Sequence, residues 1–308
     1  MHSEPVTRES YAETVAELPV PVWNSSVATE LYTRTLTVVC RRRRGGAVAG
    51  VWVCPLDTGI EGKGDVARRE HRLLPYASPW IDPNLHPLER HRVALSLIEV
   101  VLQHVHLVEL PMDPCFSEVA ALAEVGGDVA CRHTRMLDMR EGCDHRGGYS
   151  PTVRNHLRAA GRVLRVEAAD PCEFDFARAV VGQSEAAVAE RRAAGLRLRH
   201  IEGAVRCLAA VDAEGVLRGQ AFVLRDRHTA ILMHQWFDRT GPRGTPTLLV
   251  DSAVVQTLES PGVNSFDFEG SVIPGIDRFM AGFGAQAVGY GQFRWQQDGR
   301  EEPAGRFG

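Results

Sequence analysis

The chain has 308 residues with 44% hydrophobic and 24% charged side chains, which is typical of soluble globular proteins and long enough for two domains. Its formal net charge of -4 argues against wrapping a long duplex or coating a membrane surface, although a local basic patch is compatible with it. The chain shows no apolar run of about 18 residues and no signal-like N-terminus, so we expect a cytoplasmic protein without a membrane span.

The first half predicts a mixed run of strands and helices. In order, it predicts two strands joined by a charged Gly-Gly turn, a third extended stretch, a helix opened by Pro87, a strand, a short helix and a closing strand. These elements are expected at 36–39, 48–54, 73–80, 87–102, 105–110, 116–124 and 128–137.

The second half repeats this order. Strands are predicted at 204–211, 216–224, 229–237 and 265–269, a helix after residue 245, a short helix at 275–281 and a last strand through 292–295. Thr245 is the predicted cap of the longer helix, with Pro246 at its first position. Matching elements are about 158 residues apart, as Pro87 and Thr245 are, which indicates a duplicated mixed α/β unit.

A polar, glycine-rich stretch at 141–149 separates the two copies. We therefore expect two domains, 1–141 and 142–308, with 296–308 as a flexible tail. After the boundary, Ser150-Pro151 starts a helix that carries Arg154 and Arg158 on its polar face, with two more arginines following at 162 and 165. Such a basic edge is ordinarily a solvated helix face.

The cysteines and basic residues carry little functional signal. The seven cysteines are scattered and never stand in a C-x-x-C spacing, so we expect buried free thiols, with neither a disulfide framework nor a metal site. Lys63 is the only lysine, which leaves almost all positive charge on arginine, the side chain suited to bidentate phosphate contacts. Genome base composition explains the arginine excess equally well.

The most informative segment is Phe-Asp-Phe-Glu at 266–269. If it is a strand, Asp267 and Glu269 share one face, and the two phenylalanines share the other. Burial of the aromatic face would then leave the two carboxylates to be satisfied by partners or to border a wet cleft.

The order of elements in each half resembles the GNAT acyltransferase fold, and two fused copies resemble the Fem-type (FemABX-like) tandem-GNAT family. Members of that family transfer amino acids from aminoacyl-tRNA to an amine. Three segments carry the likeness, namely SPTVRNHLRAAG at 150–161, FDFEGS at 266–271 and IDRFMAGFG at 276–284, with weaker similarities at 21–23 and 74–80. The resemblance implies two GNAT-like domains, each a mixed, mostly antiparallel sheet flanked by helices. The stretch 183–194 holds only one modest helix, so no coiled-coil arm is expected.

A GNAT enzyme that uses acyl-CoA has a Q/R-x-x-G-x-G/A loop before its long helix, where backbone amides hold pyrophosphate. The corresponding segment here, 239–246, has a different spacing and two prolines, which weakens a coenzyme A interpretation. Arg239, Arg243 and Gly244 could still bind phosphate, including that of a tRNA 3′ end. The expected co-substrate is aminoacyl-tRNA, with acyl-CoA as the alternative and no tightly bound cofactor.

In GNAT-like halves the cleft opens where the fourth and fifth strands separate, here between 229–237 and 265–270. By this resemblance Glu269 is the first candidate to accept a proton or bind the substrate ammonium group, and Asp267 is the second. A carboxylate at 269 that caps the following turn or pairs with Arg278 is the competing interpretation. His234 is a third catalytic candidate, although a histidine on an apolar strand is more often a core residue.

The remaining candidates are binding residues. Gln235, Trp236 and Ser271 lie near the expected split, although Trp236 and Tyr290 are equally suited to a core position. Tyr76 and Ser78 are assigned to the acceptor side by analogy, while Arg154, Arg158 and Arg243 are assigned to phosphates of tRNA. The predicted function is aminoacyl-tRNA-dependent N-acylation of a small-molecule or peptide amine. The alternatives are an acyl-CoA-dependent N-acyltransferase and a catalytically inactive binding module.

Overall fold

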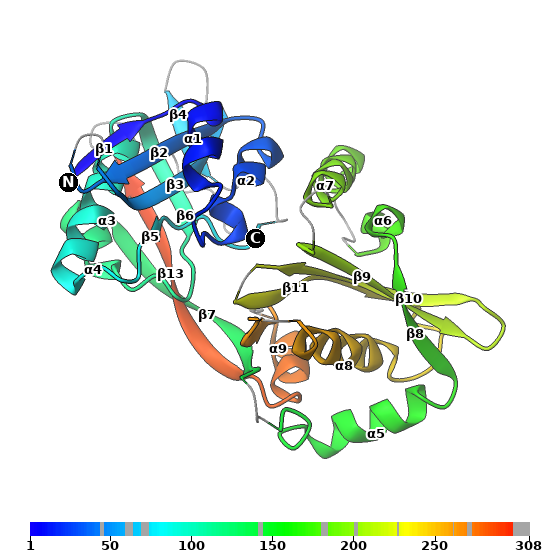
Figure 1. Ribbon diagram of the computed structural model, residues 1–308. Helices are drawn as coiled ribbons and strands as arrows, with labels where there is room; N and C mark the ends of the chain where they lie inside the picture. The colour runs from blue at the N-terminus through cyan, green and yellow to red at the C-terminus, as the bar shows by residue number, and fades with distance from the viewer. Residues whose placement is uncertain are drawn as a thin grey trace. The chain divides into compact units, whose positions relative to one another are not determined.

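The computed structural model separates the chain into two compact units (Figure 1). The first unit contains Met1–Arg132 together with the chain from Tyr290 onward, and the second contains His133–Gly289. The structure describes residues 1–43, 46–58, 64–68, 74–140, 144–179, 184–199, 203–226, 228–260, 262–269 and 273–297.

The first unit is a mixed sheet flanked by helices. Its strands run in the order β1-β2-β3-β4-β6-β13, with β5 paired separately to β3. Among its described strands, β4 and β6 pair in parallel and the other pairs are antiparallel. The strands are β1 (His2–Pro5), β2 (Thr35–Arg41), β3 (Val48–Thr58), β4 (Asp65–Arg68), β5 (Trp80–Ile81), β6 (Val105–Pro111) and the part of β13 (Gln286–Gln296) from Tyr290. The helices are α1 (Arg8–Val15), α2 (Ser26–Leu31), α3 (Pro87–Leu102) and α4 (Val119–Glu124), with a 3-10 turn at Val22–Asn24.

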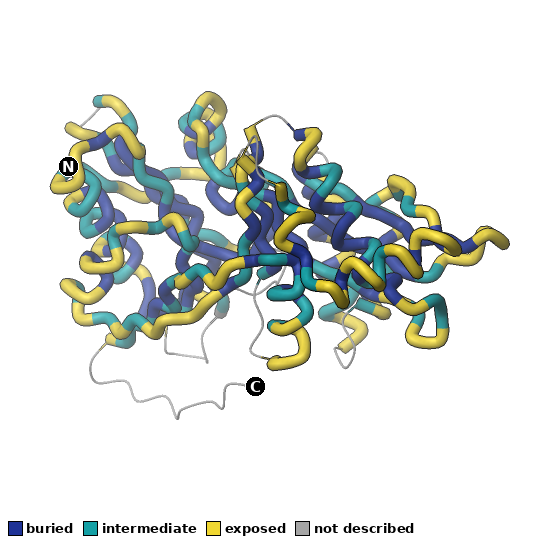
Figure 2. The backbone as a smooth tube through the Cα atoms, turned by 90° about the horizontal axis from the view of Figure 1, so that it is seen from below, coloured by how far each residue is buried: buried dark blue, intermediate teal, exposed yellow. Residues whose placement is uncertain are grey.

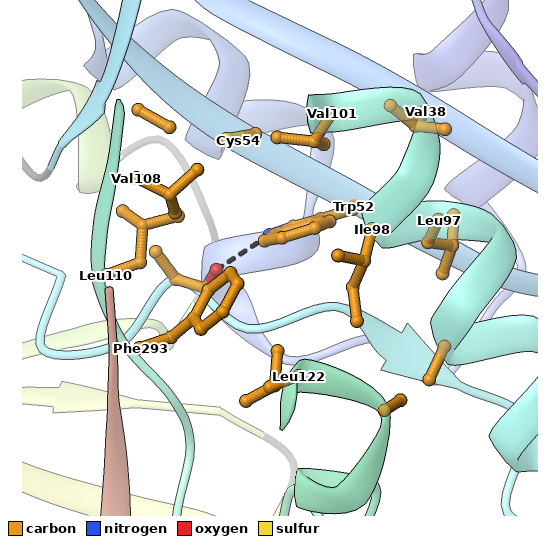
Figure 3. Packing of buried hydrophobic residues seen from close by; sticks show 14 of the residues in the cluster. Val38, Trp52, Cys54, Leu97, Ile98, Val101, Val108, Leu110, Leu122 and Phe293 are labelled. Carbon is orange, nitrogen blue, oxygen red and sulfur yellow. Dashed lines mark hydrogen bonds between the residues drawn. The ribbon is translucent and has the colours of Figure 1, made fainter. Parts of the chain in front are cut away.

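Helix α3 forms as the apolar periodicity predicts and supplies much of this unit's core. Pro87 stands in its first turn, and the His86 ring accepts a hydrogen bond from the Leu88 amide. Its buried face, with Leu97 and Ile98, packs beside the fully buried Trp52 of β3 (Figure 3). The Trp52 indole N–H is satisfied by the Ala77 carbonyl at 2.6 Å, so burial of this large side chain leaves no polar atom unpaired.

The second unit is also a mixed sheet, in the order β7-β12-β11-β10-β9-β8, with β11 and β12 as its parallel pair. Helices α8 and α9 lie on one face, and α6 and α7 lie on the other (Figure 1). The strands are β7 (Asp128–Asp138, from His133), β8 (Leu164–Ala169), β9 (Val205–Asp212), β10 (Leu217–Arg225), β11 (Thr229–Phe237) and β12 (Ser265–Asp267). The helices are α5 (Pro151–Ala160), α6 (Phe176–Ala179), α7 (Glu185–Leu198), α8 (Thr245–Leu258) and α9 (Pro274–Ala281), with a 3-10 turn at Pro171–Glu173.

The strands that close the two sequence repeats are exchanged between the units. Strand β7 ends the first repeat, yet its residues Met136 to Asp138 pair with β12 of the second unit. Strand β13 ends the second repeat, yet its residues from Gln292 pair with β6 of the first unit. The chain from Tyr290 therefore groups with the first unit, whereas the sequence placed it in a domain spanning 142–308. Strand propensity does not reveal which sheet edge a strand will join.

The duplication predicted from the sequence is present as a fold repeat. Helices α3 and α8 begin at 87 and 245, and strands β7 and β13 begin at 128 and 286, so both pairs are 158 residues apart. In both units, buried residues occur in strands such as β3 and β10 and also in the helices that pack on them, such as α3 and α8 (Figure 2). Helix α7 has 14 residues, in keeping with the prediction of a single modest helix in that region.

Several local predictions are wrong in detail. The third strand of the first half was predicted at 73–80, but the described residues 74–79 form no strand, and the third strand is β4 at Asp65–Arg68. The cap of α8 is Gly244 in a left-handed conformation, with φ 94°, and the Thr245 hydroxyl instead donates to the Pro242 carbonyl. The described cysteines are free, but only Cys40, Cys54 and Cys207 are buried, and residues from 298 lie outside the described chain. None of the described helices combines the length and apolar character needed to cross a membrane.

Candidate active site

A cavity of about 470 Å³ occupies the place in the second unit where two parallel strands part. Strands β11 and β12 pair over three residues, from Thr229 opposite Ser265 to Ile231 opposite Asp267. Strand β11 then continues to Phe237, while β12 ends. The cavity is lined by β11, by residues 268–269 and by α9, and its volume is within the range of small-molecule sites. The cleft predicted between these strands is therefore present.

A β-bulge aims the β11 side chains at this cavity. The pairing of β10 with β11 steps from Phe222–His234 to Val223–Leu232, which leaves Met233 as the extra residue. Bulges bend a strand and leave one residue outside the regular ladder, and they are common next to active sites. Leu232, Met233, His234 and Gln235 all line the cavity. The bulge thus places consecutive residues along one wall, where strict alternation would bring only every second one.

Glu269 borders the cavity in an unusual backbone conformation. Its φ is 60°, the only positive value among the described non-glycine residues, and its side chain is partly buried. For a residue that carries a Cβ, the left-handed backbone conformation costs about 1–2 kcal/mol relative to the right-handed one. Strained residues of this kind cluster at functional sites, so Glu269 remains the leading candidate from geometry as well as chemistry.

Asp267 and Glu269 do not share a strand face, contrary to the prediction, because β12 ends at Asp267. The Asp267 side chain is 1% exposed and does not line the cavity. Its Oδ1 accepts a hydrogen bond from the buried Thr134 hydroxyl and another, at 2.8 Å, from the Glu269 amide. Asp267 therefore holds the turn that presents Glu269, as Asp side chains do when they bond the backbone two residues on.

Strand β7 supplies two residues that sequence reasoning missed. Besides Thr134, Arg135 contacts both flanks of the cavity: its carbonyl accepts from the Phe268 amide at 2.9 Å, and its guanidinium makes a bidentate pair with Asp277 of α9 at 2.8 and 2.9 Å. Hydrogen bonding to this guanidinium holds the pKa of Asp277 below its ordinary value. The partners are more than 130 residues away in sequence, so no local motif could have indicated them.

His234 lies between the cavity and an aromatic cluster. It lines the cavity, and its ring also packs against an aromatic cluster, with its centroid 5.7 Å from that of Phe176 and 6.4 Å from those of Phe174 and Phe222. This packing holds the ring against α6 and β10. A catalytic role for His234 stays a prediction.

The other residues predicted near the split divide into two groups. Gln235 lines the cavity, and its amide donates to the Pro246 carbonyl at 2.9 Å. Trp236 is buried away from the lining, with its indole N–H bonded to Gln220 at 2.9 Å and Arg178 stacked 4.7 Å from its ring. Ser271 lies outside the described residues.

Tyr76 and Ser78 lie in the core of the first unit and are not among the residues that line the cavity. The Tyr76 ring meets Trp23 and Tyr290 edge to face at 5.5 and 5.6 Å. The Ser78 hydroxyl accepts from the Asp113 amide at 3.2 Å, and the Ala77 amide donates to the Pro111 carbonyl at the end of β6. The segment around Ala77 thus packs against the end of β6, which pairs in parallel with β4. In the second unit, the corresponding position beside the parallel pair β11 and β12 is occupied by the cavity.

The start of α8 offers few amides for a phosphate. Gly244 is buried, and a Cβ there would lie 2.6 Å from the His156 carbonyl of α5, so close packing as well as positive φ requires glycine. The Thr245 amide donates to Pro242 at 3.3 Å, and Pro246 has no N–H. Two of the first three residues of α8 therefore have no backbone N–H available to bind a pyrophosphate. This disfavours binding of coenzyme A at the start of this helix.

The predicted basic residues are exposed around the same contact between α5 and α8. Arg154 and Arg158 are exposed on α5, and the Arg158 guanidinium donates a hydrogen bond to the Asn155 side-chain oxygen at 2.9 Å. Arg239 and Arg243 are exposed in the loop before α8. Because Gly244 touches His156, the chain at Arg243 runs next to α5. We call the exposed Arg154 and Arg158 of α5, together with Arg239 and Arg243 of the loop before α8, the α5 basic face.

Comparisons with known proteins identify the architecture. No protein-family model matches the sequence, and a search of curated proteins finds no match. The crystal structure of FemX superposes with a TM-score of 0.67 at 10% identity, covering 94% of this chain and 97% of FemX. The chain has the Fem-type tandem GNAT fold.

Two further structures with this fold cover nearly the whole chain. L-PGS from Bacillus licheniformis has a TM-score of 0.58 at 10% identity, covering 97% of this chain and 94% of that protein. A tandem GNAT protein from the clavulanic acid biosynthesis pathway has a TM-score of 0.54 at 14% identity, covering 98% and 99%. The likeness therefore includes both repeats.

Proposed function

We propose that this protein is an N-acyltransferase that moves an aminoacyl group from aminoacyl-tRNA to the amine of a small molecule or peptide. The observation that carries the proposal is the cavity at the parting of β11 and β12, with the bulge on one wall and the Glu269 carboxylate on another. The fold shared with FemX and the other acyltransferase-fold proteins is consistent with acyl transfer there.

The proposed chemistry needs few protein groups. The acceptor nitrogen attacks the ester carbonyl, a C–N bond forms, and the C–O bond to the tRNA 3′ oxygen breaks. Glu269 would take the proton released by the attacking amine, and the leaving oxygen is protonated in turn. The proposal assigns stabilisation of the oxyanion to the backbone at the β11 bulge, whose residues line the cavity.

Two features favour tRNA as the carrier. The start of α8 has lost amides that a coenzyme A pyrophosphate would use. The α5 basic face places exposed arginines on a protein whose overall charge is -4, which suits local contact with a phosphate backbone.

The proposal is tested by incubating the protein with tRNA charged with labelled amino acids, together with a panel of amines. We expect label to appear in an amide product, and the yield to fall to background when RNase is added first. A parallel incubation with labelled acetyl-CoA addresses the other carrier. Amide formation from acetyl-CoA that is insensitive to RNase would contradict the proposal.

The α5 basic face gives a second prediction. Changing both Arg154 and Arg158 to glutamine should raise KM for aminoacyl-tRNA and flatten its dependence on salt, by about 1.5 in the slope of log affinity against log salt for two lost phosphate contacts. The matched control changes two exposed arginines of α7, Arg192 and Arg197, to glutamine. Equal effects of the two double variants would show that the effect comes from net charge and not from this face.

A further inference from the structure

The walls of the cavity are mostly apolar. Leu232 and Met233 of β11, Phe268 after β12, and Phe279 and Met280 of α9 supply hydrophobic surface on several sides. The ionisable residues in the lining are Glu269 and His234. Such a site can neutralise one positive charge on a ligand, while its remaining surface suits carbon atoms.

Large apolar side chains also stay exposed where they line this cavity. Phe237 at the end of β11 and Ile276 on α9 are 41% and 42% exposed. Exposed apolar groups gathered at one hollow mark a binding surface more often than isolated ones do. A ligand that covers both side chains would remove this apolar area from water.

We propose that the aminoacyl group taken by this cavity carries a large apolar side chain, of the leucine, methionine or phenylalanine class. The inference rests on the proposed function and adds the substrate class. The Glu269 carboxylate balances the charge of the α-ammonium group of the aminoacyl ester and also accepts the proton of the attacking amine, and the aminoacyl side chain packs between β11 and α9.

The same lining disfavours other donors. A lysyl or glutamyl side chain would bring a second charge into a space whose ionisable lining is already committed to the α-ammonium, and an unpaired buried charge is costly. A glycyl or alanyl group would leave most of a cavity of about 470 Å³ without protein–ligand contacts. One methylene group more or less in an apolar pocket changes the preference between two substrates by roughly 10–200-fold.

The test measures binding separately from turnover. Phenylalaninamide, leucinamide, alaninamide and lysinamide mimic the aminoacyl end without tRNA, and their Kd values are measured by calorimetry or by NMR titration. We expect phenylalaninamide or leucinamide to bind at least about tenfold more tightly than alaninamide or lysinamide. Equal or tighter binding of alaninamide or lysinamide would overturn the inference.

A matched pair of variants assigns that binding to the cavity. Ile276→Glu should weaken phenylalaninamide at least about tenfold and strengthen lysinamide, because it removes apolar surface and adds a carboxylate. Ile273→Glu, at a 56% exposed position outside the lining, should change neither. A shift of equal size in both variants, or in neither, would place the apolar site elsewhere and overturn the inference.

Transfer assays then separate this inference from the proposed function. One tRNA body is charged in turn with phenylalanine, leucine, alanine and lysine, and kcat/KM is compared. Selective binding of apolar amides without transfer from any charged tRNA would contradict the proposed function and leave the cavity's preference standing. Transfer that favours alanine or lysine would overturn the preference and leave the proposed function standing.

Discussion

Changing Glu269 to glutamine is expected to lower kcat/KM for aminoacyl transfer by about 10²–10⁴-fold, the range associated with a positioned proton acceptor. The amide keeps the size of the side chain and much of its hydrogen bonding, but it neither takes a proton nor balances an ammonium group. The rate is measured with labelled aminoacyl-tRNA under conditions limiting in substrate. Circular dichroism and thermal unfolding should match the wild type.

The control for this variant is Glu259→Gln. Glu259 is an exposed carboxylate in the same unit, at the end of α8, and it does not line the cavity. Its removal should leave kcat/KM unchanged. Full turnover by the Glu269→Gln protein would show that the carboxylate is not part of the reaction.

Glu269→Gly separates stability from activity at the same position. Glycine adopts a φ of 60° without a Cβ penalty, although it also makes the unfolded chain more flexible. We expect the free energy of unfolding to stay equal or to rise by up to about 1 kcal/mol, while transfer is lost. A fold more stable without its best catalytic candidate would be evidence that this conformation is kept for function.

The second large effect is expected at the buried contact between Asp267 and Thr134. Asp267→Ala leaves the Thr134 hydroxyl and the Glu269 amide without their carboxylate acceptor, at a cost of about 3 kcal/mol in the free energy of unfolding. It should also lower kcat, because the turn that presents Glu269 is no longer held. Urea unfolding monitored by tryptophan fluorescence gives the first quantity, and the transfer assay gives the second.

Two substitutions at Thr134 serve as a matched pair. Thr134→Val removes the hydroxyl at nearly constant volume and should cost about 2 kcal/mol, whereas Thr134→Ser keeps the hydroxyl and should cost about 1 kcal/mol or less. The activity of the valine variant should fall further than that of the serine variant. Equal stability of the two would mean that the hydroxyl contributes nothing to holding Asp267.

Much of the fold could be predicted from local patterns. Pro87 and the apolar stripe of α3, the hairpin of β2 and β3, and the 158-residue repeat all follow from periodicity and turn chemistry close in sequence. The resemblance to the GNAT fold then placed the candidate cavity between two strands of one repeat, β11 and β12. Glu269, His234 and Gln235 were all chosen from the sequence, and all three line it.

The predictions that differ from the structure concern residues whose surroundings are set by contacts between distant segments of the chain. The alternation of 266–269 suggests a strand with two acids on one face, but the partner strand β7 pairs only as far as Asp267, where β12 ends. Gly244 resembles a phosphate-binding glycine, yet the neighbouring His156 carbonyl accounts for it as a packing residue. Tyr76 and Ser78 were assigned by analogy to the acceptor side; both are buried in the first unit, and their role in binding stays a prediction.

The sequence by itself determined the duplicated α/β unit, the boundaries of most elements and the segment that holds the candidate catalytic carboxylate, because these depend on side-chain periods and turn residues within about 20 positions. Only the tertiary structure decided that β7 and β13 exchange sheets, and that Thr134 and Arg135 of β7 buttress the turn and α9. Which strands pair at a sheet edge depends on hydrogen bonds and packing between residues more than 100 positions apart. For that reason Asp267 is assigned as the support and Glu269 as the group that faces the cavity.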